Sequence, residues 1–217
     1  MSQLTDLRLM DTALALARTG LGTTAPNPSV GCVLVNAGEI VGIGVTASGG
    51  RPHAEKRALD MAGEAAHGAT AYVTLEPCAH IGQTPPCADA LIYAGIVRAV
   101  VACIDPDERT AGQGLDRIRA AGIIVDTGVR QAEAEALHAG FFHRVIRGWP
   151  LVTIDANASG YDLSLEIIDE ADVLTALQTL AKQGINSLRL VPGSPAATAV
   201  IKVGLVDADA TKINTPR

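Results

Sequence analysis

The stretch PHAEKRALDMA at residues 52–62, followed by TAYVTLEPC at residues 70–78, decides the fold. Apolar residues recur at helical spacing from Ala54 to Ala66, and Thr70 to Leu75 is an apolar run of the length of a buried strand. A helix that leads directly into a buried strand is the repeating unit of α/β proteins. The two segments therefore predict an α/β fold.

The same alternation extends to both sides of this stretch. Upstream, Leu7 to Ala17 has the spacing of an amphipathic helix, and two β-branched runs flank Asn36-Ala-Gly38 as in a hairpin. Downstream, the patterns predict a helix that closes at Gly95, a strand at 99–104, a helix at 112–121, a strand at 123–127 and a helix at 130–146. We therefore expect a three-layer α/β/α sandwich with a mixed central sheet.

Gly148-Trp-Pro150 interrupts this pattern and predicts a boundary. Residues 1–150 form the expected sandwich, and residues 151–217 form a short α/β remnant. The patterns in this tail predict a strand at 151–156, a Gly/Asp/Ser loop, a helix at 171–182, a strand at 187–191 and a short helix after Pro195. About 67 residues are too few for a second full α/β domain.

Charge and composition exclude several classes of partner. The 17 basic and 23 acidic side chains give a net charge of −6, so no general attraction to long nucleic acid or to an anionic membrane is expected. Aromatic residues make up 3% of the chain and form no stacking platform. No apolar run reaches the roughly twenty residues of a membrane span, and the first residues lack a signal-peptide pattern. We therefore expect a cytoplasmic protein whose cysteines are reduced.

One set of polar residues has the spacing of a catalytic metal site. His53 opens a helix, Cys78 follows a buried strand, and Cys87 lies close behind it. One imidazole and two thiolates are three zinc ligands, and the open fourth position leaves room for a water whose pKa zinc lowers toward 7. Glu55 can carry protons beside that water without ligating the metal. The pattern predicts one zinc per chain in a nucleobase deaminase.

The alternative for each of these residues is a structural role. A His-Ala-Glu at a helix start can arise by chance, and two spaced cysteines are often core thiols. The ordered combination favours the metal site. We interpret the remaining cysteines and most remaining histidines as core, surface or packing residues, namely Cys32, Cys103, His67, His138 and His143.

Four motifs together resemble the deaminase half of the bifunctional riboflavin-biosynthesis deaminase/reductase, a member of the cytidine-deaminase-like superfamily. They are PNPSVG at 26–31, PHAE at 52–55, TLEPC at 74–78 and TPPCADALI at 84–92, and the resemblance covers residues 7–150. It implies the superfamily fold and the hydrolytic removal of an exocyclic amine, as ammonia, from a diamino-ribosylamino-pyrimidinone 5′-phosphate. It further implies that His53, Cys78 and Cys87 bind zinc and that Glu55 moves protons.

By the same resemblance, Asn27 contacts the base, and His80 and Asp105 lie in the substrate pocket. Their alternative interpretations are a turn residue for Asn27 and structural roles for the other two.

Other pocket positions depart from the family pattern. Thr46 replaces a usual His, and Gln83 replaces a basic residue. Asp107 and Glu108 replace the Asn-Pro that follows Asp105-Pro106. These changes disfavour a phosphate dianion if the groups lie beside it, although Arg51 or Arg109 could compensate. The second hypothesis is therefore a paralogue that deaminates an unphosphorylated aminopyrimidine, aminopurine or nucleoside. A non-catalytic, zinc-stabilised scaffold is the third.

The tail resembles two separated parts of the family's reductase. Residues 152–162 resemble its start, with Asp155 in place of a Lys and Tyr161 in place of an Asp, and residues 182–208 resemble its end, where Pro192 interrupts a glycine turn. The parts that would bind the dinucleotide are missing, so we expect no cofactor site and no reductase activity. The tail is expected to pack as a cover or as a contact in a homo-oligomer, a dimer or tetramer.

Overall fold

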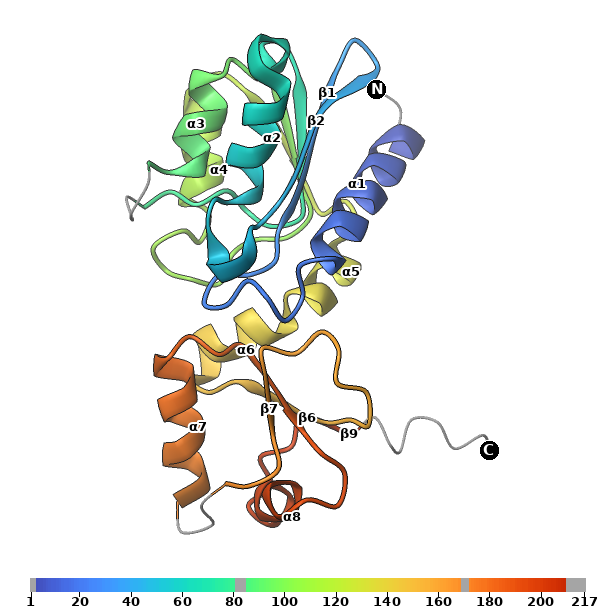
Figure 1. The fold of residues 1–217 in the computed structure, drawn as a ribbon. Coiled ribbons are helices and arrows are strands. Elements are labelled where there is room, and N and C mark those ends of the chain that lie inside the picture. The colour runs from blue at the N-terminus through green and yellow to red at the C-terminus, as the bar shows by residue number, and fades with distance from the viewer. Residues whose placement is uncertain (1–2, 81–84, 169–171, 210–217) are drawn as a thin grey trace.

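The computed structural model describes residues 3–80, 85–168 and 172–209, which form two lobes with a sheet in each (Figure 1). The N-terminal sheet has the strand order β2-β1-β3-β4-β5. Its strands are β1 (Gly31–Asn36), β2 (Glu39–Val45), β3 (Thr70–Val73), β4 (Arg98–Val101) and β5 (Ile124–Thr127). β1 runs antiparallel to both β2 and β3, whereas β3, β4 and β5 are parallel. The predicted mixed sheet is confirmed.

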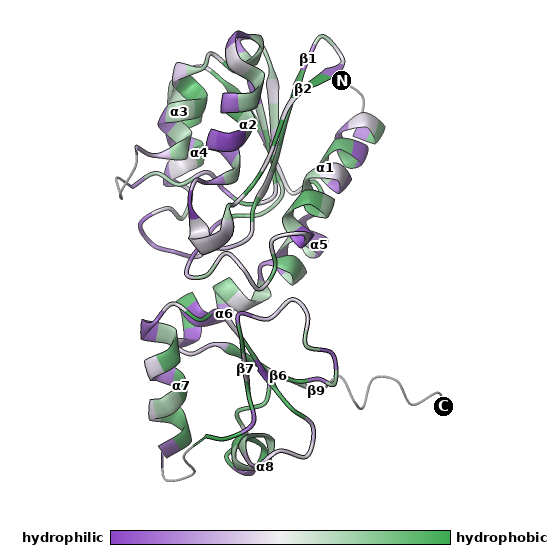
Figure 2. Ribbon diagram, viewed as in Figure 1, coloured by the Kyte–Doolittle hydropathy of each residue, from purple (hydrophilic) through white to green (hydrophobic). Residues whose placement is uncertain are grey.

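Helices cover both faces of this sheet, as the three-layer prediction requires (Figure 1). On one face lie α1 (Gln3–Arg18) and α5 (Gln131–Leu137), and on the other lie α2 (Ala54–Ala62), α3 (Cys87–Tyr93) and α4 (Gln113–Ala120). Short 3₁₀ turns occupy Ser48–Gly50 and Gly63–Ala66. In Figure 2, β1 and β2 are mostly hydrophobic, whereas α2 alternates between hydrophilic and hydrophobic segments, as a helix between core and solvent must.

Helix α1 and the sheet are in contact through backbone atoms. A Cβ atom added to Gly31 would lie 1.9 Å from the carbonyl oxygen of Ala13, so α1 contacts β1 directly at this point. Leu14, Leu34 and Tyr72 fill the neighbouring core and are almost completely buried. Small residues at the contacts therefore set the spacing between the helix and the sheet.

The C-terminal lobe has a second, all-parallel sheet in the order β7-β8-β6-β9. Its strands are β6 (Leu151–Ile154), β7 (Leu163–Leu165), β8 (Ser187–Leu190) and β9 (Ala208–Asp209). α7 (Val173–Lys182) and α8 (Pro195–Lys202) pack their apolar residues against β6 and β8 in a separate hydrophobic core. α6 (Ala139–Arg147) joins the two lobes (Figure 1).

Two predictions about secondary structure were wrong. The helix expected at 130–146 is two helices, because His138 has φ −90° and ψ 5° and ends α5 so that α6 can turn toward β6. The expected loop after β6 contains β7, which is three residues long and too short to produce a period of two. The part of the chain that the structure describes contains no helix long and apolar enough to cross a membrane.

Candidate active site

The three predicted metal ligands meet where two helices begin. His53 directly precedes α2, Cys87 is the first residue of α3, and Cys78 lies in the segment between β3 and α3. The Nδ1 atom of His53 lies 3.3 Å from the Cys87 Sγ and 3.7 Å from the Cys78 Sγ. The three donor atoms lie within 4.8 Å of one another. The N-terminal ends of both helices favour negative charge here.

Hydrogen bonds prepare Cys78 to be a thiolate. The Cys87 thiol donates to it, His53 faces it, and the Cys87 backbone N–H donates to its sulfur at 3.3 Å. These contacts lower the pKa of Cys78 to about 4, whereas the same pairing raises the pKa of Cys87. A thiolate is the form that binds metals, and one His with two Cys is a donor set that zinc prefers. The residues present therefore fit a zinc ion.

Glu55 lies in the first turn of α2 and is buried, with 3% of its surface exposed. It lines the same cavity as His53 and Cys78. Burial raises the pKa of its carboxyl group to about 7, and the nearby Cys78 adds to this shift. A carboxyl group with a pKa near 7 can both accept and return a proton at neutral pH.

The cavity beside these residues has a volume of about 260 Å³. All the predicted substrate contacts that the structure describes line it, namely Asn27, Thr46, His80, Asp105 and Asp107. The prediction for Gln83 lies outside the described residues. Glu108 is not among the residues that line this cavity. Five of the substrate contacts predicted from the sequence therefore line the same cavity.

Asn27 contacts one of the predicted metal ligands, His53. Its Nδ2 atom donates to the Gly50 carbonyl at 2.8 Å and lies 3.2 Å from the His53 Nε2. Because the His53 Nδ1 faces the two thiols, this second contact acts on the opposite side of the imidazole ring. Asn27 therefore helps to set the orientation of the ring.

The other predicted contacts have hydrogen-bond partners in the backbone or in neighbouring side chains. The Thr46 hydroxyl accepts the Val30 N–H at 2.9 Å, and the His80 Nδ1 lies 3.4 Å from the Thr110 hydroxyl. Burial raises the pKa of Asp105 to about 7, and its Oδ1 accepts the Asp107 N–H at 2.8 Å.

Sequence reasoning missed Glu76, which organises this part of the site. Its carboxylate accepts N–H groups from Gly112 at 2.9 Å, Gly114 at 3.0 Å, and Leu115 and Asp105 each at 3.3 Å. It thereby caps α4 and ties the segment after β3 to the Asp105 loop. The signal was available, because Glu76 lies inside the TLEPC motif, two residues before Cys78.

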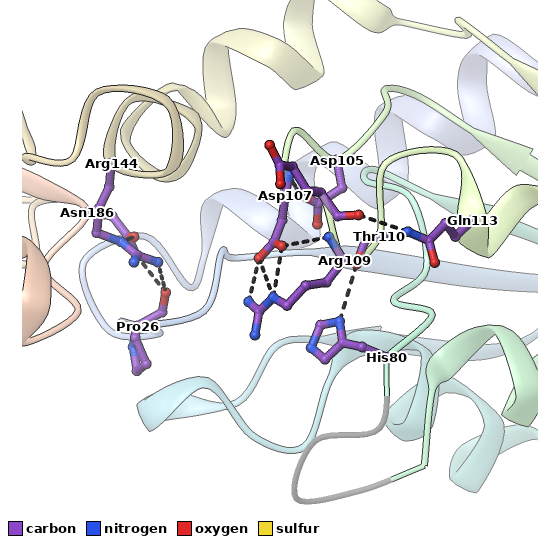
Figure 3. Close-up of polar contacts among 10 residues, drawn as sticks. Pro26, His80, Asp105, Asp107, Arg109, Thr110, Gln113, Arg144 and Asn186 are labelled. Carbon is purple, nitrogen blue, oxygen red and sulfur yellow. Dashed lines mark hydrogen bonds and ion pairs between the residues drawn. The ribbon is translucent and has the colours of Figure 1, made fainter.

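Three arginines also line the cavity: Arg51, Arg109 and Arg144. Figure 3 shows Arg109 against Asp107, and Arg144 beside Asn186 and the Pro26 carbonyl. Arg51 and Arg109 were candidates from the sequence, whereas nothing in the local pattern of α6 indicated Arg144. The cavity thus has a metal-ligand end and a wall with several cations.

Known proteins resemble this chain in sequence and fold. Residues 4–103 match the sequence family described as the cytidine and deoxycytidylate deaminase zinc-binding region. A protein named diaminohydroxyphosphoribosylamino-pyrimidine deaminase, from Buchnera aphidicola subsp. Acyrthosiphon pisum, is 49% identical over 145 residues, which cover 67% of this chain and 99% of that protein. The chain belongs to the diaminohydroxyphosphoribosylaminopyrimidine deaminase family. The family resemblance is confirmed.

Longer relatives of this deaminase family also match. The riboflavin biosynthesis protein RibD of Escherichia coli K12 is 53% identical over 180 residues, or 83% of this chain and 48% of that protein. The chain thus spans about half the length of this curated relative. The structure titled Acinetobacter baumannii RibD, form 1, matches with a TM-score of 0.82 and 30% identity, covering 95% of this chain and 85% of that one. This match confirms the cytidine-deaminase-like fold of the deaminase.

Proposed function

We propose that the protein is a zinc-dependent hydrolytic deaminase that removes an exocyclic amine, as ammonia, from the diamino-ribosylamino-pyrimidinone 5′-phosphate of riboflavin biosynthesis. The observation that carries the proposal is the donor group of His53, Cys78 and Cys87 beside a cavity that His53, Cys78 and Glu55 line. The names of the relatives, riboflavin biosynthesis protein and diaminohydroxyphosphoribosylamino-pyrimidine deaminase, support the substrate.

His53, Cys78 and Cys87 would hold one zinc ion per chain, with each residue offering one ligand atom. Zinc in such a site supplies Lewis acidity that activates water. Glu55 takes one proton from the attacking water and gives it to the ring nitrogen, and then carries the remaining hydroxyl proton to the leaving amine. The C–N bond breaks, a C=O bond replaces it, and one water is consumed for each ammonia released.

The remaining cavity residues orient the ring in this proposal. Asn27 offers an amide to the base edge, and His80 lines the same cavity from a different segment. Asp105 has a pKa near 7 and can therefore donate or accept a hydrogen bond at the substrate. These contacts would present the amine-bearing carbon to the metal-ligand end.

The cations on the wall favour the phosphorylated substrate. Arg51 and Arg144 supply positive charge at a cavity that lacks the family's usual His at position 46, and the Arg109 guanidinium offsets the charge of Asp107. Guanidinium groups are well suited to phosphate. The second candidate is an unphosphorylated aminopyrimidine, aminopurine or nucleoside, and the Asp107 carboxylate on the same wall favours it.

An ammonia-release assay with zinc-loaded protein tests both candidates. The panel contains the phosphorylated riboflavin intermediate, its dephosphorylated form, and free aminopyrimidines, aminopurines and nucleosides. We expect the highest kcat/KM for the phosphorylated intermediate. The highest value for an uncharged compound would establish the second candidate, and full zinc without turnover on any compound would leave the scaffold hypothesis.

We propose that the C-terminal lobe carries out no reduction. Two residues that replace the reductase pattern bond to each other, because the Tyr161 hydroxyl donates to the Asp155 Oδ2 at 2.7 Å. The Arg189 guanidinium donates to the Asp155 carbonyl at 2.7 Å and to the Ala156 carbonyl at 2.9 Å. These side chains thus have structural partners. NADPH oxidation in the presence of the deaminated product would contradict the proposal.

We also propose that the protein self-associates and works in a reducing compartment, the cytoplasm. Apolar side chains remain exposed on both lobes, including Ile124 on the edge strand β5, Ile146 and Ile167. All four cysteines are free thiols. Sedimentation at micromolar concentration tests self-association, and a monomer there would refute it.

A further inference from the structure

Asn186, a buried side chain of the C-terminal lobe, contacts two residues that line the cavity, Arg144 and Pro26 (Figure 3). Asn186 directly precedes β8 and is 6% exposed. Its Oδ1 accepts the Arg144 Nε–H at 2.6 Å, and its Nδ2–H donates to the Pro26 carbonyl at 3.3 Å. Arg144 closes the triangle by donating from Nη2 to the same carbonyl at 3.0 Å.

The backbone of Asn186 is held independently of this triangle. Its N–H donates to the Asp162 carboxylate at 2.8 Å, and its carbonyl accepts the Leu151 N–H at 2.9 Å. Both partners belong to the C-terminal lobe. Removing the side-chain amide therefore leaves the main-chain connections of the lobe in place.

The turn before Asn186 also fits against Pro26. Gly184 has φ +91°, and a Cβ atom there would lie 2.4 Å from the Pro26 Cβ. Only a glycine allows both this conformation and this close approach. The C-terminal lobe is thus shaped to contact Pro26 at two successive points.

Both partners of Asn186 face the cavity. Arg144 and Pro26 line it, and Pro26 directly precedes Asn27, whose amide lies 3.2 Å from the His53 Nε2. The single side chain of Asn186 therefore fixes a cation on the wall and the loop that contacts a metal ligand. A shift of either would change how a substrate sits against the reacting end.

We propose that Asn186 is a positioning residue of the deaminase site, so that the C-terminal lobe is a working part of that site in this protein. The inference rests on the proposed function, because it concerns the same reaction. The Buchnera relative is covered to 99% by 145 residues, which leaves no room in it for a lobe of this size. A deaminase of this family can therefore be built without the lobe. The proposal concerns the role of the lobe in positioning cavity residues in this chain.

Kinetics of zinc-loaded, full-length variants on the phosphorylated intermediate test the proposal. Asn186→Ala removes both contacts, and Asn186→Asp keeps an acceptor for Arg144 but loses the donor to Pro26. The matched control is Asn157→Ala, an exposed amide of the same lobe whose side chain, among the described residues, hydrogen-bonds within its own loop. Zinc content, Tm, kcat and KM are measured for each variant.

We expect Asn186→Ala to keep its zinc and to raise KM about tenfold with a smaller change in kcat, the pattern of weakened substrate binding. Asn186→Asp should raise KM by a smaller factor. The double variant Arg144→Ala/Asn186→Ala should have a kcat/KM only slightly below that of Arg144→Ala alone, because the two side chains act together. The Asn157→Ala variant should behave as the wild type.

Wild-type kinetics in Asn186→Ala, or fully additive losses in the double variant, would overturn the proposal. If Asn186→Ala does not fold, Asn186→Asp decides the question, and a wild-type KM in that variant is the contrary result. If the wild-type protein deaminates nothing in the panel, the proposed function and this inference fail together. If the wild type is active and the Asn186 variants have wild-type kinetics, only the inference fails.

Discussion

Arg109 forms a bidentate ion pair with Asp107 on the wall of the cavity (Figure 3). The Arg109 Nε donates to the Asp107 Oδ1 at 2.9 Å, its Nη2 donates to Oδ2, and its backbone N–H donates to Oδ1 at 3.0 Å. This pairing holds the pKa of Asp107 below its usual value. The carboxylate that replaces the family's Asn is therefore charged but largely neutralised by its neighbour.

Loss of Arg109 should expose that charge to the substrate. We predict that Arg109→Ala lowers kcat/KM for the phosphorylated intermediate at least tenfold, with a much smaller effect on its dephosphorylated form. Adding Asp107→Asn, which restores the residue usual in the family, should recover most of the loss. Steady-state kinetics on the matched pair measure both effects, and equal losses on the two compounds would show that Arg109 has only a structural role.

Glu55 should control turnover but not metal binding. We predict that Glu55→Gln keeps its zinc and lowers kcat by a factor of roughly 100 to 10,000, the usual contribution of general acid and base catalysis. Glu64→Gln is the matched control, because Glu64 follows the same helix and is exposed. Metal analysis and ammonia release give the two readouts. Turnover near the wild-type rate in Glu55→Gln would remove this residue from the mechanism.

The two site cysteines should behave differently from the two core cysteines. Cys78→Ala and Cys87→Ala each remove a zinc ligand, so we expect both variants to lose metal and activity together. Cys103→Ala is the control, because its buried thiol donates to the Thr74 carbonyl and lies outside the donor group. Elemental analysis after gel filtration checks the prediction. Full zinc in either site variant would show that the ligand set is wrong.

The residues that the sequence could predict are those whose role depends on a local pattern. His53 and Glu55 start a helix, and Cys78 follows a buried strand, so helical spacing and strand length were enough to place them. The same patterns predicted the strands of the N-terminal sheet. At these positions the residue types of the metal-site pattern coincide with the predicted helix start and strand end.

The residues that the sequence could not predict act across long separations. Arg144 and Asn186 are 42 residues apart, and Asn186 and Pro26 are 160 apart, so no periodicity connects them. Asp107 was recognised as a departure from the family, but its pairing with Arg109 depends on the shape of a loop. The sequence predicted a wall that repels phosphate because it could not show that Arg109 neutralises the Asp107 carboxylate.

Asp6 anchors α1 to the sheet through a largely buried ion pair with Arg98 of β4. It accepts from the Arg98 guanidinium at 2.8 and 2.9 Å and from the Tyr72 hydroxyl at 2.6 Å. We predict that Asp6→Asn destabilises the protein by about 2 kcal/mol, because the Arg98 guanidinium loses its buried charge partner and keeps the half-exposed Asp126. Asp11→Asn, on the same helix, breaks an exposed pair with Arg130 and should have a much smaller effect on stability. Urea denaturation of the two variants would contradict the prediction if their midpoints coincide.

His138 should make the stability of the fold depend on pH. Its ring is almost completely buried where α5 meets α6, its Nε2 lies 3.2 Å from the Thr74 hydroxyl, and its Nδ1 has no hydrogen-bond partner in the described parts of the chain. Burial lowers the pKa of His138 to about 4. The folded protein therefore keeps the ring neutral at pH values where the unfolded chain, with a pKa near 6.5, has already bound a proton.

Because the unfolded state binds this proton first, stability is complete above about pH 6.5 and falls as the pH drops toward 4. From pH 7.5 to 4.5 the ring alone should remove about 2 to 3 kcal/mol from the free energy of unfolding. His138→Gln can keep a hydrogen bond to Thr74 but cannot titrate, so its advantage over the wild type should grow by that amount as the pH falls. Other titrating groups, including those at the metal site, are shared by both proteins and cancel in the difference. Urea denaturation at the two pH values measures it, and parallel pH profiles for the two proteins would show that His138 is already protonated in the folded state or does not titrate in this range.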